Sequence, residues 1–173
     1  MIEKIKLNLT DTPFLNSDHT THSGSCIKHQ VKELTDIHDR YGGMPETYTM
    51  HNTLIHQLWW DKDSIDFANI GKQLGMEVIT VSSILQPPGN VIPLHRDTFY
   101  AITKQFPDDT RTKVRANIYL EDWKMGHFTQ YNDEVVTHWK AGDGLLWDSS
   151  IEHLGANCGF QDKYTLQVSG FLN

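Results

Sequence analysis

The sequence has few cysteines and no long apolar run. Two cysteines in 173 residues, Cys26 and Cys158, are too few for a disulfide framework and are not spaced as a zinc knuckle. No apolar run approaches the roughly 18 residues that a membrane span needs, and the first residues lack the apolar core of a signal peptide. We therefore expect a cytoplasmic protein with free thiols and no membrane partner.

An excess of basic residues is also absent. Lys and Arg number 15 against 22 Asp and Glu, which gives a formal net charge of -7. A protein that binds nucleic acid normally carries a basic patch, because phosphate contacts depend on Lys and Arg. The acidic balance therefore disfavours nucleic acid as a partner. The length and the 38% hydrophobic content predict a single domain, residues 1–173, with a buried core.

The two parts of the chain differ in pattern. Residues 1–76 are mostly polar, and we expect them to form an irregular support with helices near 27–41 and 63–74. Asp63 or Ser64 would cap the second helix, and Gly75 would end it.

Residues 77–173 contain short segments rich in β-branched and aromatic residues, separated by Gly, Pro, Asn or Asp. This spacing is typical of antiparallel β proteins. It predicts a mainly β fold, an eight-stranded double-stranded β-helix (a cupin-like jelly roll), with the N-terminal helices supporting one sheet.

A candidate metal site begins at His95 and Asp97. Residues two apart on a strand point the same way, so these side chains should project together while Arg96 points away. His153, 58 residues later and also next to an apolar strand, is the natural third ligand. Two histidines and one carboxylate leave adjacent metal positions open, as in the facial triad of non-haem iron(II) oxygenases.

The other histidines lack a carboxylate at useful spacing. We expect them to be solvated or hydrogen-bonded structural residues: His19, His22, His29, His38, His51, His56, His127 and His138.

Four segments resemble the core strands of the 2-oxoglutarate and Fe(II)-dependent oxygenases: PPGNVIPLHRD, KVRANIYLEDW, GDGLLWDSSIEHLGAN and KYTLQVSGF. Within that superfamily, the pattern is most similar to the aspartyl/asparaginyl β-hydroxylase-like branch. The shared features are the turn Pro88-Gly89, the turn 147–150, Asn157, and Lys163 ten residues after His153. The chain departs from the branch at Asp97, where many members have glycine, and at Lys163, where most relatives have arginine.

The resemblance implies Fe(II), 2-oxoglutarate and O2 as cofactor and co-substrates. It implies that Lys163, with Thr165 on the same strand face, pairs with the far carboxylate of 2-oxoglutarate, because an unpaired buried carboxylate is costly. Arg115 is the competing anchor, and Asn117 on the same face is a candidate partner for the C1 carboxylate.

The aromatic residues allow two interpretations. Trp139 and Trp147 alternate with polar residues and should be core. The pair Trp59–Trp60 lies outside the expected strands and is a candidate cover for the mouth of the site. Phe99, Tyr100 and the polar loop 103–112 follow the metal strand and are a candidate lid.

The sequence thus predicts a dioxygenase, a monomer or weak dimer, that hydroxylates a C–H bond of a small molecule or peptide side chain and releases succinate and CO2. Two alternatives stay open. One is a cupin-like metal-dependent isomerase or lyase, which would not need Lys163. The other is a metal-free jelly-roll binding module, in which His95 and His153 are polar core residues.

Overall fold

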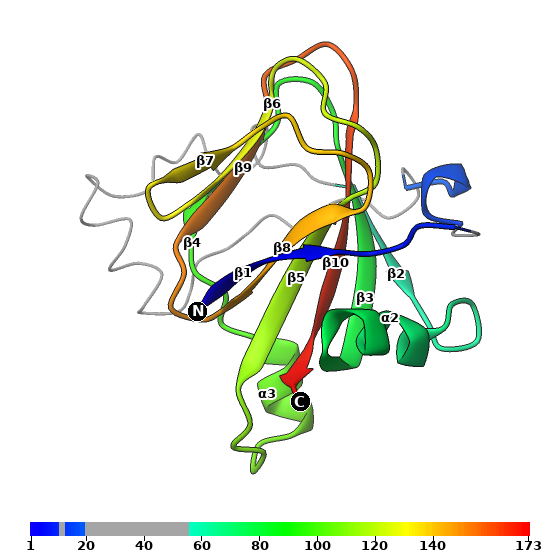
Figure 1. Cartoon of the computed structure of the whole chain (residues 1–173), viewed down its shortest axis with the longest axis vertical. Helices are drawn as coiled ribbons and strands as arrows, with labels where there is room; N and C mark the ends of the chain where they lie inside the picture. Colours follow the sequence, from blue (N-terminus) through cyan, green and yellow to red (C-terminus); the bar gives the residue numbers. More distant parts are fainter. Residues whose placement is uncertain (11–12, 20–55) are drawn as a thin grey trace.

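The computed structural model describes residues 1–10, 13–19 and 56–173 (Figure 1). The helix expected near 27–41 lies outside these ranges. In the described part, the strands form two antiparallel sheets, and Figure 1 shows the smaller sheet beside the upper half of the larger one. The predicted mainly β jelly roll is confirmed. No helix among the described residues is long and apolar enough to span a membrane.

The larger sheet has six strands in the order β1-β8-β5-β10-β3-β2, and the smaller has four in the order β4-β9-β6-β7. The larger sheet comprises β1 (Ile2–Lys6), β2 (His56–Trp60), β3 (Met76–Gln86), β5 (Lys113–Tyr119), β8 (Asp143–Asp148) and β10 (Lys163–Leu172). The smaller comprises β4 (Val91–His95), β6 (His127–Tyr131), β7 (Glu134–Val136) and β9 (His153–Asn157).

The two faces of the larger sheet carry different chemistry. Its outer face holds the main apolar core, which includes Val114, Ala116 and Ile118 of β5 and Leu166 and Val168 of β10. The alternate residues of the same strands face the smaller sheet, because side chains on a strand alternate between faces. The interior of the barrel is therefore free to be polar, while the outer face supplies the hydrophobic stabilisation.

Helix α2 (Phe67–Leu74) packs its apolar side on this outer face and contributes Phe67, Ile70 and Leu74 to the core. It begins later than predicted. The N-cap is Asp66, whose side chain accepts from the amide of Asn69. The expected caps are used elsewhere: the amides of Asp63 and Ser64 donate to Asp61 and close a separate turn. The predicted end at Gly75 is correct, and its φ of 66° is the left-handed cap conformation.

Two strands lie in the region that we expected to be helical or irregular. β1 pairs with β8, and β2 pairs with β3, each at an edge of the larger sheet. β1 is exposed along most of its length, so it shows no apolar alternation that would identify it in the sequence. The short helix η1 (Phe14–Asn16) packs Phe14 edge-on against Trp60, with ring centroids 5.3 Å apart.

The prediction that Trp59–Trp60 lies outside the strands is wrong, because both residues belong to β2. Trp60 pairs with Val81 and packs against the outer core, so it faces away from the barrel interior. Trp59 lies on the opposite face of the strand and is 58% exposed.

The segment after the metal strand is not a continuous loop. Helix α3 (Tyr100–Gln105) follows Phe99, and Phe99, Ile102 and Phe171 form a small apolar cluster with Phe106 against it. The end of the segment is also fixed, because Arg111 forms an ion pair with Glu77.

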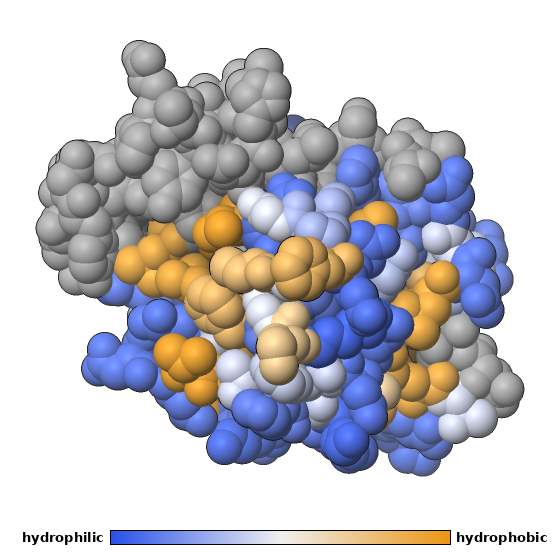
Figure 2. All heavy atoms as spheres, turned by 90° about the horizontal axis from the view of Figure 1, so that it is seen from above, coloured by the Kyte–Doolittle hydropathy of each residue, from blue (hydrophilic) through white to orange (hydrophobic). Residues whose placement is uncertain are grey.

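The loops β5–β6 and β9–β10 meet at one end of the molecule (Figure 1), where the amide of Cys158 donates to the carbonyl of Gly126. Seen from above, apolar patches lie among mostly hydrophilic atoms (Figure 2). Met125 and Phe160, one in each loop, are 84% and 100% exposed. Gly126 has a φ of +90°, and a Cβ there would lie 2.4 Å from the amide nitrogen of Gly159. Close backbone contact therefore joins the two loops.

We expect Gly126→Ala to destabilise the protein more than Gly89→Ala. Both positions have a positive φ, but a Cβ at Gly89 meets nothing within 4 Å. Backbone strain alone should cost about 1–2 kcal/mol at Gly89. At Gly126 the clash with Gly159 should add about 1–3 kcal/mol. Urea unfolding of the two variants measures this, and equal losses would contradict the close approach of the loops.

Candidate metal centre

Two histidines face each other across the smaller sheet. His95 at the end of β4 is the direct cross-strand partner of His153 at the start of β9, and their ring centroids are 4.2 Å apart. Both side chains are buried, as is Asp97. One ligand atom from each of the three residues lies within 4.8 Å of the others. The structure therefore brings together the three residues that the sequence suggested.

Asp97 reaches the site from a different local structure than predicted. β4 ends at His95, so Asp97 lies beyond the strand rather than on it. It still points inward with His95. Arg96 points away, as expected, and pairs with Glu152 at 3.0 Å.

Asp97 is held by donors from the larger sheet. Its Oδ2 accepts from the indole Nε1 of Trp147 at 2.9 Å and lies 3.6 Å from Nε2 of His153, while its Oδ1 pairs with Arg115. Burial alone would raise the pKa of Asp97, but Arg115, the two histidines and Trp147 together hold it below its usual value. The carboxylate is thus ionised, which is the form that binds a metal.

His153 presents a ring nitrogen to the same point. Its Nδ1 lies 3.3 Å from the carbonyl of Ile151, which can only accept, so the tautomer with the proton on Nδ1 satisfies this contact and leaves the Nε2 lone pair for a metal. Burial lowers the pKa of His153 in spite of the nearby Asp97. A neutral imidazole with a fixed tautomer is the usual form of a metal-bound histidine.

Lys163 is buried within the barrel, with 2% of its surface exposed. Its Nζ donates to the carbonyls of Phe128 at 2.9 Å and Ala156 at 3.4 Å. Among the described residues, no carboxylate forms an ion pair with it. Burial lowers the pKa of Lys163 to about 7, although Cys158 opposes this shift. Thr165 is buried on the same strand face, as predicted.

The lysine head lies near the metal residues. Nζ is 3.5 Å from the position that a Cβ of Gly155 would take, so the glycine leaves room for it. Gly155 follows His153 by two residues on β9, which corresponds to about 7 Å along a strand. That separation suits a short dicarboxylate with one end at the three ligand atoms and the other at the ammonium group.

Arg115 and Asn117 share the inner face of β5, as predicted. The guanidinium of Arg115 is directed at Asp97, and its Nε donates to Ser169 at 3.0 Å. The amide of Asn117 lies 3.4 Å from the hydroxyl of Tyr131. Arg115 thus forms an ion pair with Asp97, a candidate metal ligand. Lys163, in contrast, has no carboxylate partner among the described residues and is the better candidate anchor for 2-oxoglutarate.

Two aromatic residues of the lining, Tyr119 and Tyr131, were not singled out from the sequence as site residues. Tyr119 stacks on Trp139 with centroids 3.8 Å apart, and Tyr131 lies parallel to His153 at 5.9 Å. Burial raises the pKa of Tyr119 to about 12, so its hydroxyl stays protonated. The alternation of residues along KVRANIY and HFTQY could have placed Tyr119 and Tyr131 on one face of their strands. It could not have indicated which side chains they contact.

Three of the remaining histidines that the structure describes fit the prediction. His127 bonds to the carbonyl of Gln161, His138 is exposed, and His19 bonds to Ser83 on the outer face. His56 differs: it lies on β2, and its Nδ1 is buried with no hydrogen-bond partner among the described residues. The other four fall outside the described residues: His22, His29, His38 and His51.

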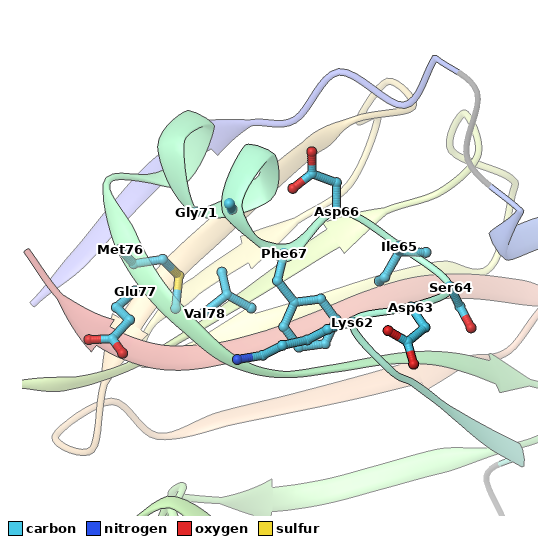
Figure 3. A pocket seen from close by; sticks show the side chains of 11 residues that line it. Lys62, Asp63, Ser64, Ile65, Asp66, Phe67, Gly71, Met76, Glu77 and Val78 are labelled. Atoms are coloured by element: carbon cyan, nitrogen blue, oxygen red, sulfur yellow. The ribbon is translucent and has the colours of Figure 1, made fainter.

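An open hollow lies on the opposite face of the larger sheet, between α2 and β3 (Figure 3). Phe67, Met76 and Val78 form its floor, and Lys62 and Asp63 lie at its rim. It shares no residue with the metal centre.

Similar folds occur among solved structures. The viral collagen prolyl hydroxylase from Paramecium bursaria Chlorella virus 1, solved with 2OG, is 15% identical with a TM-score of 0.51, over 66% of this chain and 77% of that chain. A Pseudomonas putida prolyl-4-hydroxylase is 21% identical with a TM-score of 0.49, over 69% and 72%. A predicted oxalate decarboxylase from Thermotoga maritima is 20% identical with a TM-score of 0.44, over 69% and 82%.

No protein-family model and no curated protein matches the chain. At these identities the likeness establishes the jelly-roll fold alone. The narrower resemblance to the aspartyl/asparaginyl branch stays a prediction.

We expect Lys163→Met to stabilise the ligand-free protein at pH 7 by about 1–4 kcal/mol, because it removes a buried cation that lacks a carboxylate. The unfolded lysine has its usual pKa of 10.5, and the folded one about 7. Between these values the unfolded chain binds a proton that the folded chain does not, so stability rises with pH. The gain from Lys163→Met should therefore be full below pH 7 and shrink towards pH 10. Urea unfolding at several pH values tests this, and a difference that is independent of pH would contradict it.

Proposed function

We propose that this protein is an Fe(II)- and 2-oxoglutarate-dependent oxygenase that hydroxylates a C–H bond. The observation that carries the proposal is the pairing of two features in one barrel: the His95–Asp97–His153 cluster, and the buried amine of Lys163 beside Gly155, two residues after His153 on β9. A metal site alone fits many cupins. The buried cation at that separation adds a reason for a dicarboxylate.

The residues present fit both groups. Two imidazoles and a carboxylate are the donor set of a facial iron(II) site. Lys163 has two carbonyls as its hydrogen-bond acceptors and can donate a third hydrogen bond. Thr165 beside it is a candidate hydroxyl donor to the same carboxylate.

When bound, iron(II) and 2-oxoglutarate supply the oxidising chemistry: O2 and the oxo acid give succinate and CO2, and one oxygen atom enters the substrate as a hydroxyl. The chain's own part is binding and orientation. His95, Asp97 and His153 would hold the metal. Lys163 would fix the far carboxylate, and the buried side chains of Tyr119 and Tyr131 would help to exclude water from the interior.

Substrate and assembly also remain proposals. We propose a small molecule or a peptide side chain as substrate and a cytoplasmic monomer or weak dimer as the working form, with Asn117 as a partner of the C1 carboxylate. The segment around Phe99 and Tyr100 is the proposed border of the substrate opening.

The first test is an anaerobic titration of the metal-free protein with Fe(II) and 2-oxoglutarate. We expect the weak visible charge-transfer band of the chelate, lost in His95→Ala and weakened in Lys163→Met. His138→Ala, which changes an exposed histidine, should leave the band unchanged.

The alternatives give different results in the same titration. Metal binding without the band would favour the cupin-like isomerase or lyase. No metal binding at all would mean that His95 and Asp97 are structural, as in a metal-free binding module.

We further expect 2-oxoglutarate to bind with uptake of a proton at pH 8. A carboxylate next to Lys163 favours the charged ammonium and raises its pKa from about 7, so the complex takes a proton from the buffer. Calorimetry in buffers of different ionisation enthalpy measures the proton count, with Mn(II) present in place of iron. Lys163→Met should abolish the uptake. Equal enthalpies in all buffers for the parent protein would count against Lys163 as the anchor.

A further inference from the structure

Contacts with two side chains of the larger sheet hold the Asp97 carboxylate in one orientation. Trp147 donates to its Oδ2, the oxygen that lies 3.6 Å from His153, and Arg115 pairs with its Oδ1. The two oxygens therefore have different surroundings. Oδ2 faces the histidines, and Oδ1 faces the guanidinium.

Arg115 is itself held in place. Its Nε donates to Ser169, and its guanidinium lies over the ring of Phe99, 5.5 Å from the centroid. Ser169 and Trp147 are its direct cross-strand neighbours on β10 and β8. Ser169, Arg115 and Trp147 thus lie side by side on three neighbouring strands. Arg115 and Trp147 donate to Asp97, and Ser169 holds Arg115 in place.

Phe99 contributes a strained backbone to this arrangement. Its φ of 50° is in the left-handed region, which is unfavourable for a bulky residue. The ring is nevertheless buried against Ile102 and Phe171, which stabilises this conformation. The strain lies two residues after Asp97, where the chain turns from β4 into α3 with the ring under Arg115.

A carboxylate binds a metal through one oxygen or through both. We propose that Arg115 is a positioning residue that restricts Asp97 to one-oxygen ligation, and so keeps open a metal position that the second oxygen would fill. The inference rests on the metal centre of the proposed function, but not on 2-oxoglutarate. It has a cost for affinity, because the positive guanidinium also repels the metal ion.

The test is Arg115→Met, which keeps the length of the side chain and removes its charge and donors. With Mn(II) as the probe, the parent protein should hold about three exchangeable waters on the metal, as three protein ligands of a six-coordinate ion leave. In Arg115→Met, Oδ1 is free to bind, so water-proton relaxation should fall by about a third. Mn(II) should also bind at least about tenfold more tightly, because a like charge is gone.

Three further variants separate positioning from general damage. Arg115→Lys keeps the charge and should retain the parent's relaxation. Ser169→Ala loosens Arg115 and should shift both readouts in the same direction by less, which also covers the case in which Arg115→Met does not fold. Arg111→Met, which makes the same change at an exposed ion pair, should match the parent.

The outcomes distinguish the two proposals. If the parent binds Mn(II) and Arg115→Met shows the same relaxation and affinity, or weaker binding, the positioning role is overturned while the metal centre stands. If the parent binds neither Mn(II) nor Fe(II), both the positioning role and the proposed function fail.

Discussion

The burial of charge inside a small barrel is the constraint on which the rest of this structure depends. Asp97 and Lys163 are both buried, and buried ions are unfavourable unless donors or acceptors are fixed around them. The larger sheet supplies Arg115 and Trp147 to the first, and the smaller sheet supplies backbone carbonyls to the second. These contacts require the two sheets to face each other in one fixed relative position. The apolar core on the outer face stabilises that arrangement.

Much of this was predictable where one sheet face is apolar and the other polar. KVRANIY alternates so clearly that both the strand and the shared face of Arg115 and Asn117 follow from the sequence. The spacing of His95 and Asp97 predicted a shared direction, and the outcome is correct although only His95 lies on the strand. Lys163 and Thr165 were likewise placed on one strand face because a strand repeats every two residues.

The rest could not be predicted, for two physical reasons. Edge strands such as β1 and β2 need no apolar alternation, because one side of them faces solvent, so their sequences resemble loops. Second, which side chains meet across the two sheets depends on the order of the strands, and the alternation within a single strand does not reveal that order. Nothing near Asp97 in the sequence indicates that Arg115 and Trp147 meet its two oxygens. The alternation of Trp147 predicts a buried ring, but not the hydrogen bond of its indole.

The same electrostatics argues that the proposed metal and co-substrate enter the barrel as a pair. With neutral imidazoles, Asp97, Arg115 and protonated Lys163 give the interior a net charge of +1. A divalent cation alone would raise this to +3, and a dicarboxylate alone would lower it to -1 with its second carboxylate lacking a partner. Together they leave the net charge unchanged. Because uncompensated charge is costly in a buried site, each is expected to favour the other. The coupling then originates in the arrangement that places the Lys163 amine beside Gly155 of β9, two residues after the candidate metal ligand His153.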